Sequence, residues 1–95
     1  MAATVVSAPG TAARNVTVSV PAGSTYNFFL YTDVSLTLPP FGGAAIYVVT
    51  PSGNLNVRIA DLDAEHNYSA AIVGPVDVAV VIPASTQNLG VGRYP

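Results

Sequence analysis

Short stretches in which apolar and polar residues alternate recur along the chain, with turn residues between them about every ten residues. Strict alternation indicates a β-strand with one buried face, as where Val16, Val18 and Val20 alternate with Thr17 and Ser19. Regular spacing of such strands is typical of a sandwich or barrel. We expect strands at 4–7, 15–20, 25–32, 34–38, 44–50, 55–59, 68–73 and 76–82.

The residue types also favour a single all-β domain. Val, Ile and Thr, whose branched side chains fit a pleated sheet, number 27, whereas Leu, Met, Gln, Glu, Lys and Arg together number 12. The polar segment 61–67 is predicted to form a loop or a single helical turn. The sequence thus predicts an antiparallel β-sandwich or flattened barrel of about seven or eight short strands, of which a jelly roll is one form. The domain spans 1–95, with a loose N-terminal arm at 1–14 and an irregular C-terminal tail at 83–95.

Several of the expected strands are apolar on both faces. In the most aromatic of them, one face carries Tyr26, Phe28 and Leu30, and the other carries Phe29 and Tyr31. A two-layer sandwich without helices buries only the inner face of each sheet, and larger exposed apolar patches usually mark interaction sites. We therefore expect another chain to cover the second face, the alternative being a loop or terminal arm of the same chain.

Charge is scarce along the whole chain. Charged residues make up 8% of the sequence, none of them is Lys, and the formal net charge is -2, whereas ordinary soluble domains are about 25% charged. This favours a surface covered by other subunits, with a neutral Ser- and Thr-rich surface as the alternative. Three scattered Arg do not form the basic cluster that nucleic acid requires. We recognise no secretory signal and no apolar stretch long enough to span a bilayer, so neither nucleic acid nor a membrane is an expected partner.

Candidate chemistry is confined to one polar segment, which holds Asp61, Asp63, Glu65 and the single histidine, His66. Alternating acids are typical of a calcium loop, but the required Gly and Glu at its sixth and twelfth positions are replaced by His66 and Ile72. A solvated loop is the simpler interpretation. No nucleophile elbow and no phosphate-binding loop is recognised. We therefore expect no catalytic residues, no cofactor, no metal site and no enzymatic activity.

The chain as a whole combines a Lys-free composition rich in Ala, Val and Thr with the loose start 1–10, the strand and turn 18–24 and the irregular end 87–95. In these features it resembles the small decoration or cement proteins of tailed-phage capsids. The resemblance implies a structural subunit that is assembled in the host cytoplasm and clamps shell subunits together on the virion surface. The implied partners are copies of itself, in a homo-oligomer such as a trimer, and a major structural protein such as a capsid subunit.

An interface of this kind is expected to use the N-terminal arm and the aromatic residues outside the core. The alternative function is a carbohydrate-binding or adhesive β-sandwich module, in which some of the five Tyr would stack on sugar rings. The residues that we predict to form the interface are Phe29, Tyr31, Phe41, Tyr47, Arg93 and Tyr94.

Overall fold

The computed structural model describes residues 3–32, 43–49 and 57–95, which form eight strands and one short 3-10 turn. No helix in these ranges is long and apolar enough to cross a membrane. The expected strand at 34–38 and the predicted interface residue Phe41 lie outside the described residues. In chain order the elements are β1 (Thr4–Gly10), β2 (Arg14–Val20), β3 (Thr25–Thr32), β4 (Ala44–Val48), β5 (Val57–Leu62), η1 (Ala64–His66), β6 (Ser69–Val73), β7 (Val76–Ile82) and β8 (Leu89–Tyr94).

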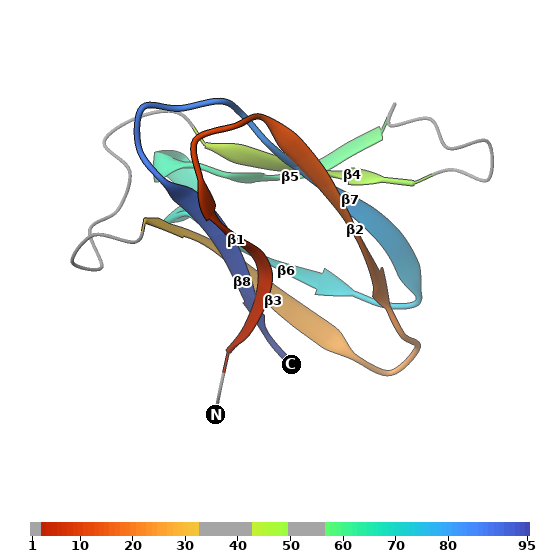
Figure 1. Ribbon diagram of the computed structural model, residues 1–95. Coiled ribbons are helices and arrows are strands. Elements are labelled where there is room, and N and C mark those ends of the chain that lie inside the picture. Colours follow the sequence, from red (N-terminus) through yellow and green to blue (C-terminus); the bar gives the residue numbers. More distant parts are fainter. Residues whose placement is uncertain (1–2, 33–42, 50–56) are drawn as a thin grey trace.

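The strands pair as one long hairpin folded over on itself. β1 pairs with β8, β2 with β7, β3 with β6 and β4 with β5, each of them antiparallel. Two further antiparallel pairings, β3 with β8 and β4 with β7, join these ribbons into two four-stranded sheets with the orders β1-β8-β3-β6 and β2-β7-β4-β5. The sheets pack as two layers (Figure 1). The predicted antiparallel sandwich is therefore confirmed, and its pairing pattern is that of an eight-stranded jelly roll.

The core lies between the two sheets and is built from alternate residues of the strands. In the first sheet Phe28 and Leu30 point inward, and in the second sheet Ile46 pairs with Val80 and both are fully buried. Burying each such side chain is worth about 1.5–3 kcal/mol. The inward set predicted for 25–32 is confirmed by these burials. The largest fully buried side chains are Phe28, Leu30, Ile46, Leu62, Ile82, Val20, Val78, Val80 and Val91.

The C-terminal segment differs from the irregular tail that we predicted for 83–95. Residues Leu89–Tyr94 form β8, which lies between β1 and β3 in the middle of the first sheet. Leu89 and Val91 are buried, and their neighbours Gly90 and Gly92 occupy the outward positions. Glycine at these outward positions hides the usual alternation of apolar and polar side chains, which is why the hydrophobic pattern did not predict a strand.

The N-terminal segment is likewise not a loose arm throughout 1–14. Thr4–Gly10 forms the edge strand β1, whose register against β8 shifts twice, and β2 already begins at Arg14. The guanidinium of Arg14 donates to the Ser7 hydroxyl at 2.7 Å and to the backbone carbonyls of Ala8, Gly10, Ala12 and Leu89. One arginine thus ties β1 and β8 to the start of β2.

Candidate interface

The outward side of the first sheet carries a row of aromatic rings. On β3, Phe29 and Tyr31 alternate with the buried residues, and the register pairs Phe29 with Gly92 and Tyr31 with Gly90. Each ring lies across its glycine, because a Cβ built at Gly92 would come within 2.5 Å of the Phe29 ring and one at Gly90 within 2.8 Å of the Tyr31 ring. The rings therefore lie along the sheet.

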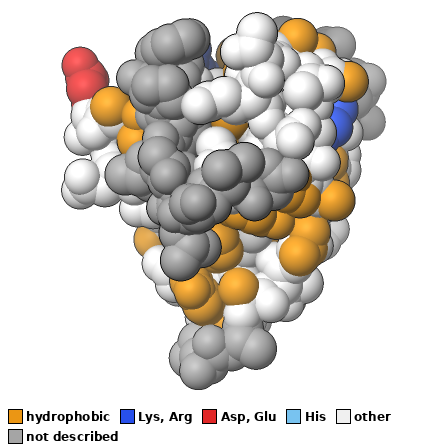
Figure 2. All heavy atoms as spheres, turned by 60° about the vertical axis from the view of Figure 1, so that its left-hand side comes forward, with side chains coloured by type: hydrophobic (Ala, Val, Ile, Leu, Met, Phe, Trp, Pro, Cys, Tyr) orange, Lys and Arg blue, Asp and Glu red, His pale blue; other side chains and the backbone are white. Residues whose placement is uncertain are grey.

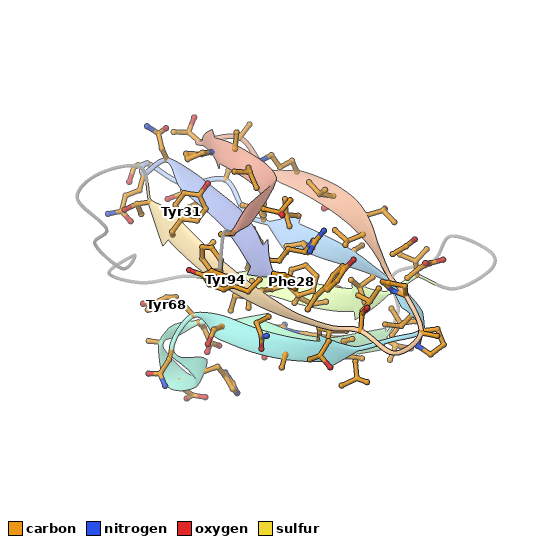
Figure 3. The ribbon with its side chains drawn as sticks, turned by 90° about the horizontal axis from the view of Figure 1, so that it is seen from below. Phe28, Tyr31, Tyr68 and Tyr94 are labelled. Atoms are coloured by element: carbon orange, nitrogen blue, oxygen red, sulfur yellow. The ribbon has the colours of Figure 1, made fainter. Side chains whose placement is uncertain are left out.

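Tyr94 at the end of β8 extends this row. Its ring centroid lies 5.2 Å from that of Phe29, with 30° between the planes. Phe29 and Tyr31 are 5.7 Å apart, with 42° between their planes. Figure 3 shows Tyr31 and Tyr94 following one another on the side of the sheet that faces the viewer. We call Phe29, Tyr31 and Tyr94 the aromatic row; Tyr94, its most open member, is 41% exposed.

The surroundings of the aromatic row are neutral and partly apolar. Val5 on β1 and Val73 on β6 share the outward side and are 61% and 69% exposed. The only charged residue in these four strands is Arg93, which pairs with the inward Phe28. Figure 2, which looks toward the left-hand side of Figure 1, shows hydrophobic side chains in several groups at the surface and charged side chains near the outline. Larger exposed apolar patches usually mark a surface that binds another molecule.

Tyr47 lies on the other outer face of the sandwich. It follows the buried Ile46 on β4 and pairs with Ala79 of β7 and Arg58 of β5. The structure therefore separates Tyr47 from the aromatic row by the thickness of the core. Of the predicted interface residues that the structure describes, Phe29, Tyr31 and Tyr94 come together in the aromatic row, whereas Tyr47 lies on the opposite sheet.

Arg93 has an intramolecular partner. Its guanidinium carbon lies 3.8 Å from the centroid of the Tyr26 ring, which is a cation–π contact. Tyr26 is on the inward face of β3, partly buried against the core. The structure therefore places Arg93 at an end of the sandwich, away from the outward rings.

Sequence reasoning missed the two glycines on which the aromatic row rests. The signal that could have found them is the stretch Leu89-Gly90-Val91-Gly92, where glycine alternates with buried aliphatic residues. A glycine that faces a cross-strand aromatic ring has no side chain to displace that ring, so the ring covers the strand's backbone. This pattern marks a strand as clearly as a polar residue would.

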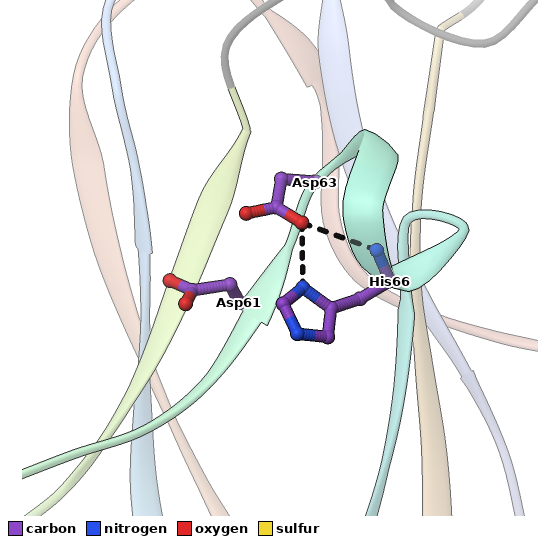
Figure 4. A group of neighbouring side chains, drawn as sticks. All are labelled: Asp61, Asp63 and His66. Atoms are coloured by element: carbon purple, nitrogen blue, oxygen red, sulfur yellow. Dashed lines mark hydrogen bonds and ion pairs between the residues drawn. The ribbon is translucent and has the colours of Figure 1, made fainter.

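The polar segment after β5 forms a second feature on the surface, separate from the aromatic row. Asp63 caps η1, and its carboxylate Oδ1 accepts hydrogen bonds from the backbone N–H of His66 at 3.2 Å and from the ring Nδ1 at 2.6 Å (Figure 4). The bond to His66 lowers the pKa of the Asp63 carboxyl, and the bond to Asp63 raises the pKa of the His66 imidazole. Asp61 instead pairs with the guanidinium of Arg58, which raises the pKa of Arg58.

No family model matches the chain, and comparison with curated proteins and with solved structures finds no match either.

Proposed function

We propose that this chain is a non-enzymatic structural subunit of a larger assembly, and that the assembly is a virion, in which it acts as a capsid decoration or cement protein. The observation that carries the proposal is the aromatic row on an outer face without charged side chains. Jelly rolls are common in viral capsid domains, which is an analogy of fold. The expected place of action is the virion surface, after assembly in the host cytoplasm.

The aromatic row has two properties that lower the free-energy cost of binding a second protein: its rings are held in place and it carries no charge. Tyr is among the residues that most often carry binding energy, because it buries a large rigid area with few rotatable bonds. The ring of Phe29 is held between Tyr31 and Tyr94 and above Gly92, so little side-chain freedom is left to lose on binding. A neutral face also requires no charged partner to compensate it.

The proposed partners are copies of the chain itself and a major structural protein such as a capsid subunit. Each contact through a small face would be modest. A homo-oligomer that engages a repeated lattice at several points gains affinity through its high effective concentration, without a new type of contact. Shell stabilisation would then follow from joining neighbouring lattice subunits.

The test is sedimentation equilibrium of the purified chain, as wild type and as Tyr94→Asp, over a wide range of concentrations. Tyr94 is exposed, so a carboxylate there should leave the fold intact while placing an uncompensated charge in the interface. Thr17→Asp is the matched control, because Thr17 is an exposed strand residue of the opposite sheet.

We expect the wild type to form a closed oligomer and Tyr94→Asp to weaken its association at least about tenfold, while Thr17→Asp does not. A wild type that stays monomeric at every concentration, and that does not bind to capsid shells, would contradict the proposal. Equal weakening by both variants would show that the interface is not the aromatic row.

A carbohydrate-binding module is the second candidate, and one observation favours it. Asn27 pairs with Tyr94 in the register, so an amide and a partly exposed phenol ring stand side by side on the same face. Aromatic faces stack on apolar parts of ligands while neighbouring polar groups fix their orientation. Binding of a glycan in an array, lost in Tyr94→Ala and kept in Thr17→Ala, would establish this function instead.

A further inference from the structure

The connection between β5 and β6 brings together three side chains of the types that bind metal ions. Asp61, Asp63 and His66 each offer one ligand atom, and these atoms lie within 4.8 Å of one another. Within residues 3–32, 43–49 and 57–95, no other three His or acidic side chains lie close enough to share an ion. Figure 4 shows the His66 ring bonded to Asp63, with Asp61 beside them.

The backbone fixes this arrangement. Asp61 and Asp63 flank Leu62, which is fully buried, so the alternation of an extended chain places both carboxylates on the outer side. The Asp63 carbonyl accepts backbone hydrogen bonds from His66 at 3.1 Å and from Tyr68 at 2.8 Å. The tight turn brings His66 back over Asp63, since residues three apart are aligned in a 3-10 helix. The site is thus anchored through Leu62 to the core.

The donor set distinguishes this group from an acidic patch. Calcium and magnesium take oxygen ligands, whereas an imidazole combined with carboxylates suits zinc and neighbouring transition metals. Zinc binds such donors at about 2.0–2.2 Å. The Nδ1 of His66 and the Oδ1 of Asp63 are already 2.6 Å apart across one shared proton, so an ion that replaces this proton would need only a small separation of the two groups.

Space for the remaining coordination is also available. Asp61 and His66 line a hollow of about 500 Å³ between β5 and β6, whose walls include Ser69, Ala70 and Arg58. A zinc site with three protein ligands keeps its fourth position for water or an external ligand. We propose that Asp61, Asp63 and His66 bind one divalent transition-metal ion of the zinc type, with the fourth position open to this hollow.

Arg58 is the internal competitor of the ion. Its guanidinium pairs with the Asp61 carboxylate, so binding requires that Asp61 turn an oxygen away from Arg58 and that the two cations share one carboxylate. Removing the guanidinium should therefore strengthen metal binding. This expectation is specific to the proposed ligand set, because Asp61 is the proposed ligand that accepts hydrogen bonds from Arg58, whereas Asp63 and His66 bond to each other.

The test is calorimetric titration of the full, untagged chain, stripped of metal, with ZnCl₂ and separately with CaCl₂. We expect saturable binding of one Zn²⁺ per chain and no comparable binding of Ca²⁺. His66→Gln and Asp63→Asn should each weaken Zn²⁺ binding by about tenfold or more, the scale seen for altered metal-site residues. Arg58→Gln should strengthen it. Asp63→Asn preserves the helix cap, because Asn caps as well as Asp.

Glu65→Gln is the matched control, since it removes one negative charge from the same turn without removing a proposed ligand. Its effect on Zn²⁺ affinity should stay within about twofold, the scale of a screened charge at a distance. The proposal is overturned by the absence of saturable Zn²⁺ binding up to about 1 mM. It is equally overturned if His66→Gln binds as tightly as the wild type, or if Glu65→Gln weakens binding as much as His66→Gln does.

Discussion

The ring of Phe29 lies across the backbone of Gly92, its register partner on the neighbouring strand β8. The same relationship recurs two residues along, where Tyr31 lies across Gly90. Glycine at two neighbouring outward positions of β8 lets the aromatic side chains of β3 lie on the sheet, and it leaves their outer surfaces free for contact. The aromatic row is therefore a joint product of two strands that are far apart in sequence.

A methyl group at Gly92 tests this relationship. The Cβ of Gly92→Ala would lie 2.5 Å from the Phe29 ring, so the ring must leave its position over β8. We expect a loss of about 1–3 kcal/mol of unfolding free energy, as for other overpacked sites, measured by urea denaturation. Gly10→Ala is the control, because its Cβ would meet only the Arg14 side chain at 3.7 Å, an ordinary contact distance.

The double variant Phe29→Ala/Gly92→Ala separates overpacking from the remaining effects of the methyl group. Without the ring there is nothing for the new Cβ to displace, so Gly92→Ala should cost much less in the Phe29→Ala background. A Gly92→Ala cost that is the same in both backgrounds would show that the ring does not rest on Gly92.

Neighbouring phenylalanines on β3 should differ in their contribution to stability. Phe28 is fully buried in the core, whereas Phe29 is only partly buried on the outer face. We expect Phe28→Ala to reduce the unfolding free energy by about 3–5 kcal/mol and Phe29→Ala to reduce it by less than about 2 kcal/mol. Denaturant unfolding at low protein concentration measures both without a contribution from association. Equal losses would mean that Phe29 belongs to the core and not to an interface.

Most of the sandwich followed from the hydrophobic pattern, because sustained alternation of apolar and polar residues is characteristic of half-buried strands. The two faces of β3 were predicted correctly, as the burial of Phe28 and Leu30 confirms. The edge strand β5 was placed less well: simple alternation over the expected strand 55–59 would turn Val57 and Ile59 inward together, but they are 50% and 42% exposed. A register shift beside Tyr47 interrupts the alternation of β5 against β4, and such a bulge leaves no hydrophobic signal.

The aromatic row could not be predicted from the hydrophobic pattern alone, because its composition depends on which strands are neighbours in the sheet. The alternation of glycine with aliphatic residues can indicate a strand, but that Gly90 and Gly92 face aromatic rings is known only once β8 is placed next to β3. Likewise, nothing in the spacing of Tyr47 shows that it lies on the opposite sheet from Tyr31, since that depends on strand order. The alternation along β3 indicates which aromatic residues share a face, but their grouping with Tyr94 depends on the topology.

The Asp63–His66 bond should be visible in the titration of the histidine. The bond raises the pKa of His66 and lowers that of Asp63. A raised His pKa stabilises the fold below its unfolded value of about 6.5, and this stability is lost as pH rises through the folded pKa. A lowered Asp pKa stabilises the fold above about 3.9, and this stability is lost as pH falls through the folded pKa. The bond therefore contributes most between these two values.

An NMR titration of the His66 ring, with a chelator present, measures this directly. We expect a pKa above about 6.5 in the wild type and a return toward 6.5 in Asp63→Asn, which keeps the helix cap but not the charge. Glu65→Gln, which leaves the Asp63–His66 bond in place, should cause the smaller change. An unchanged His66 pKa in Asp63→Asn would show that the bond does not persist in solution.

Arg14 should matter more to stability than its place at a strand end suggests. Its guanidinium donates to the Ser7 hydroxyl and to four backbone carbonyls, including that of Leu89 at the start of β8. Hydrogen bonds from a charged donor contribute about 1.5–3 kcal/mol each where they are buried. These bonds are only partly buried, so we expect Arg14→Ala to cost about 2 kcal/mol of unfolding free energy in total. Arg58→Ala is the control, since its exposed pair with Asp61 should contribute little.

Hydrogen exchange locates the effect of Arg14→Ala within the sandwich. β1 and the first residues of β8 should lose protection while β4 and β7 keep theirs, because only the former are tied by this side chain. Uniform loss of protection across both sheets would instead make Arg14 a contributor to global stability without a local role.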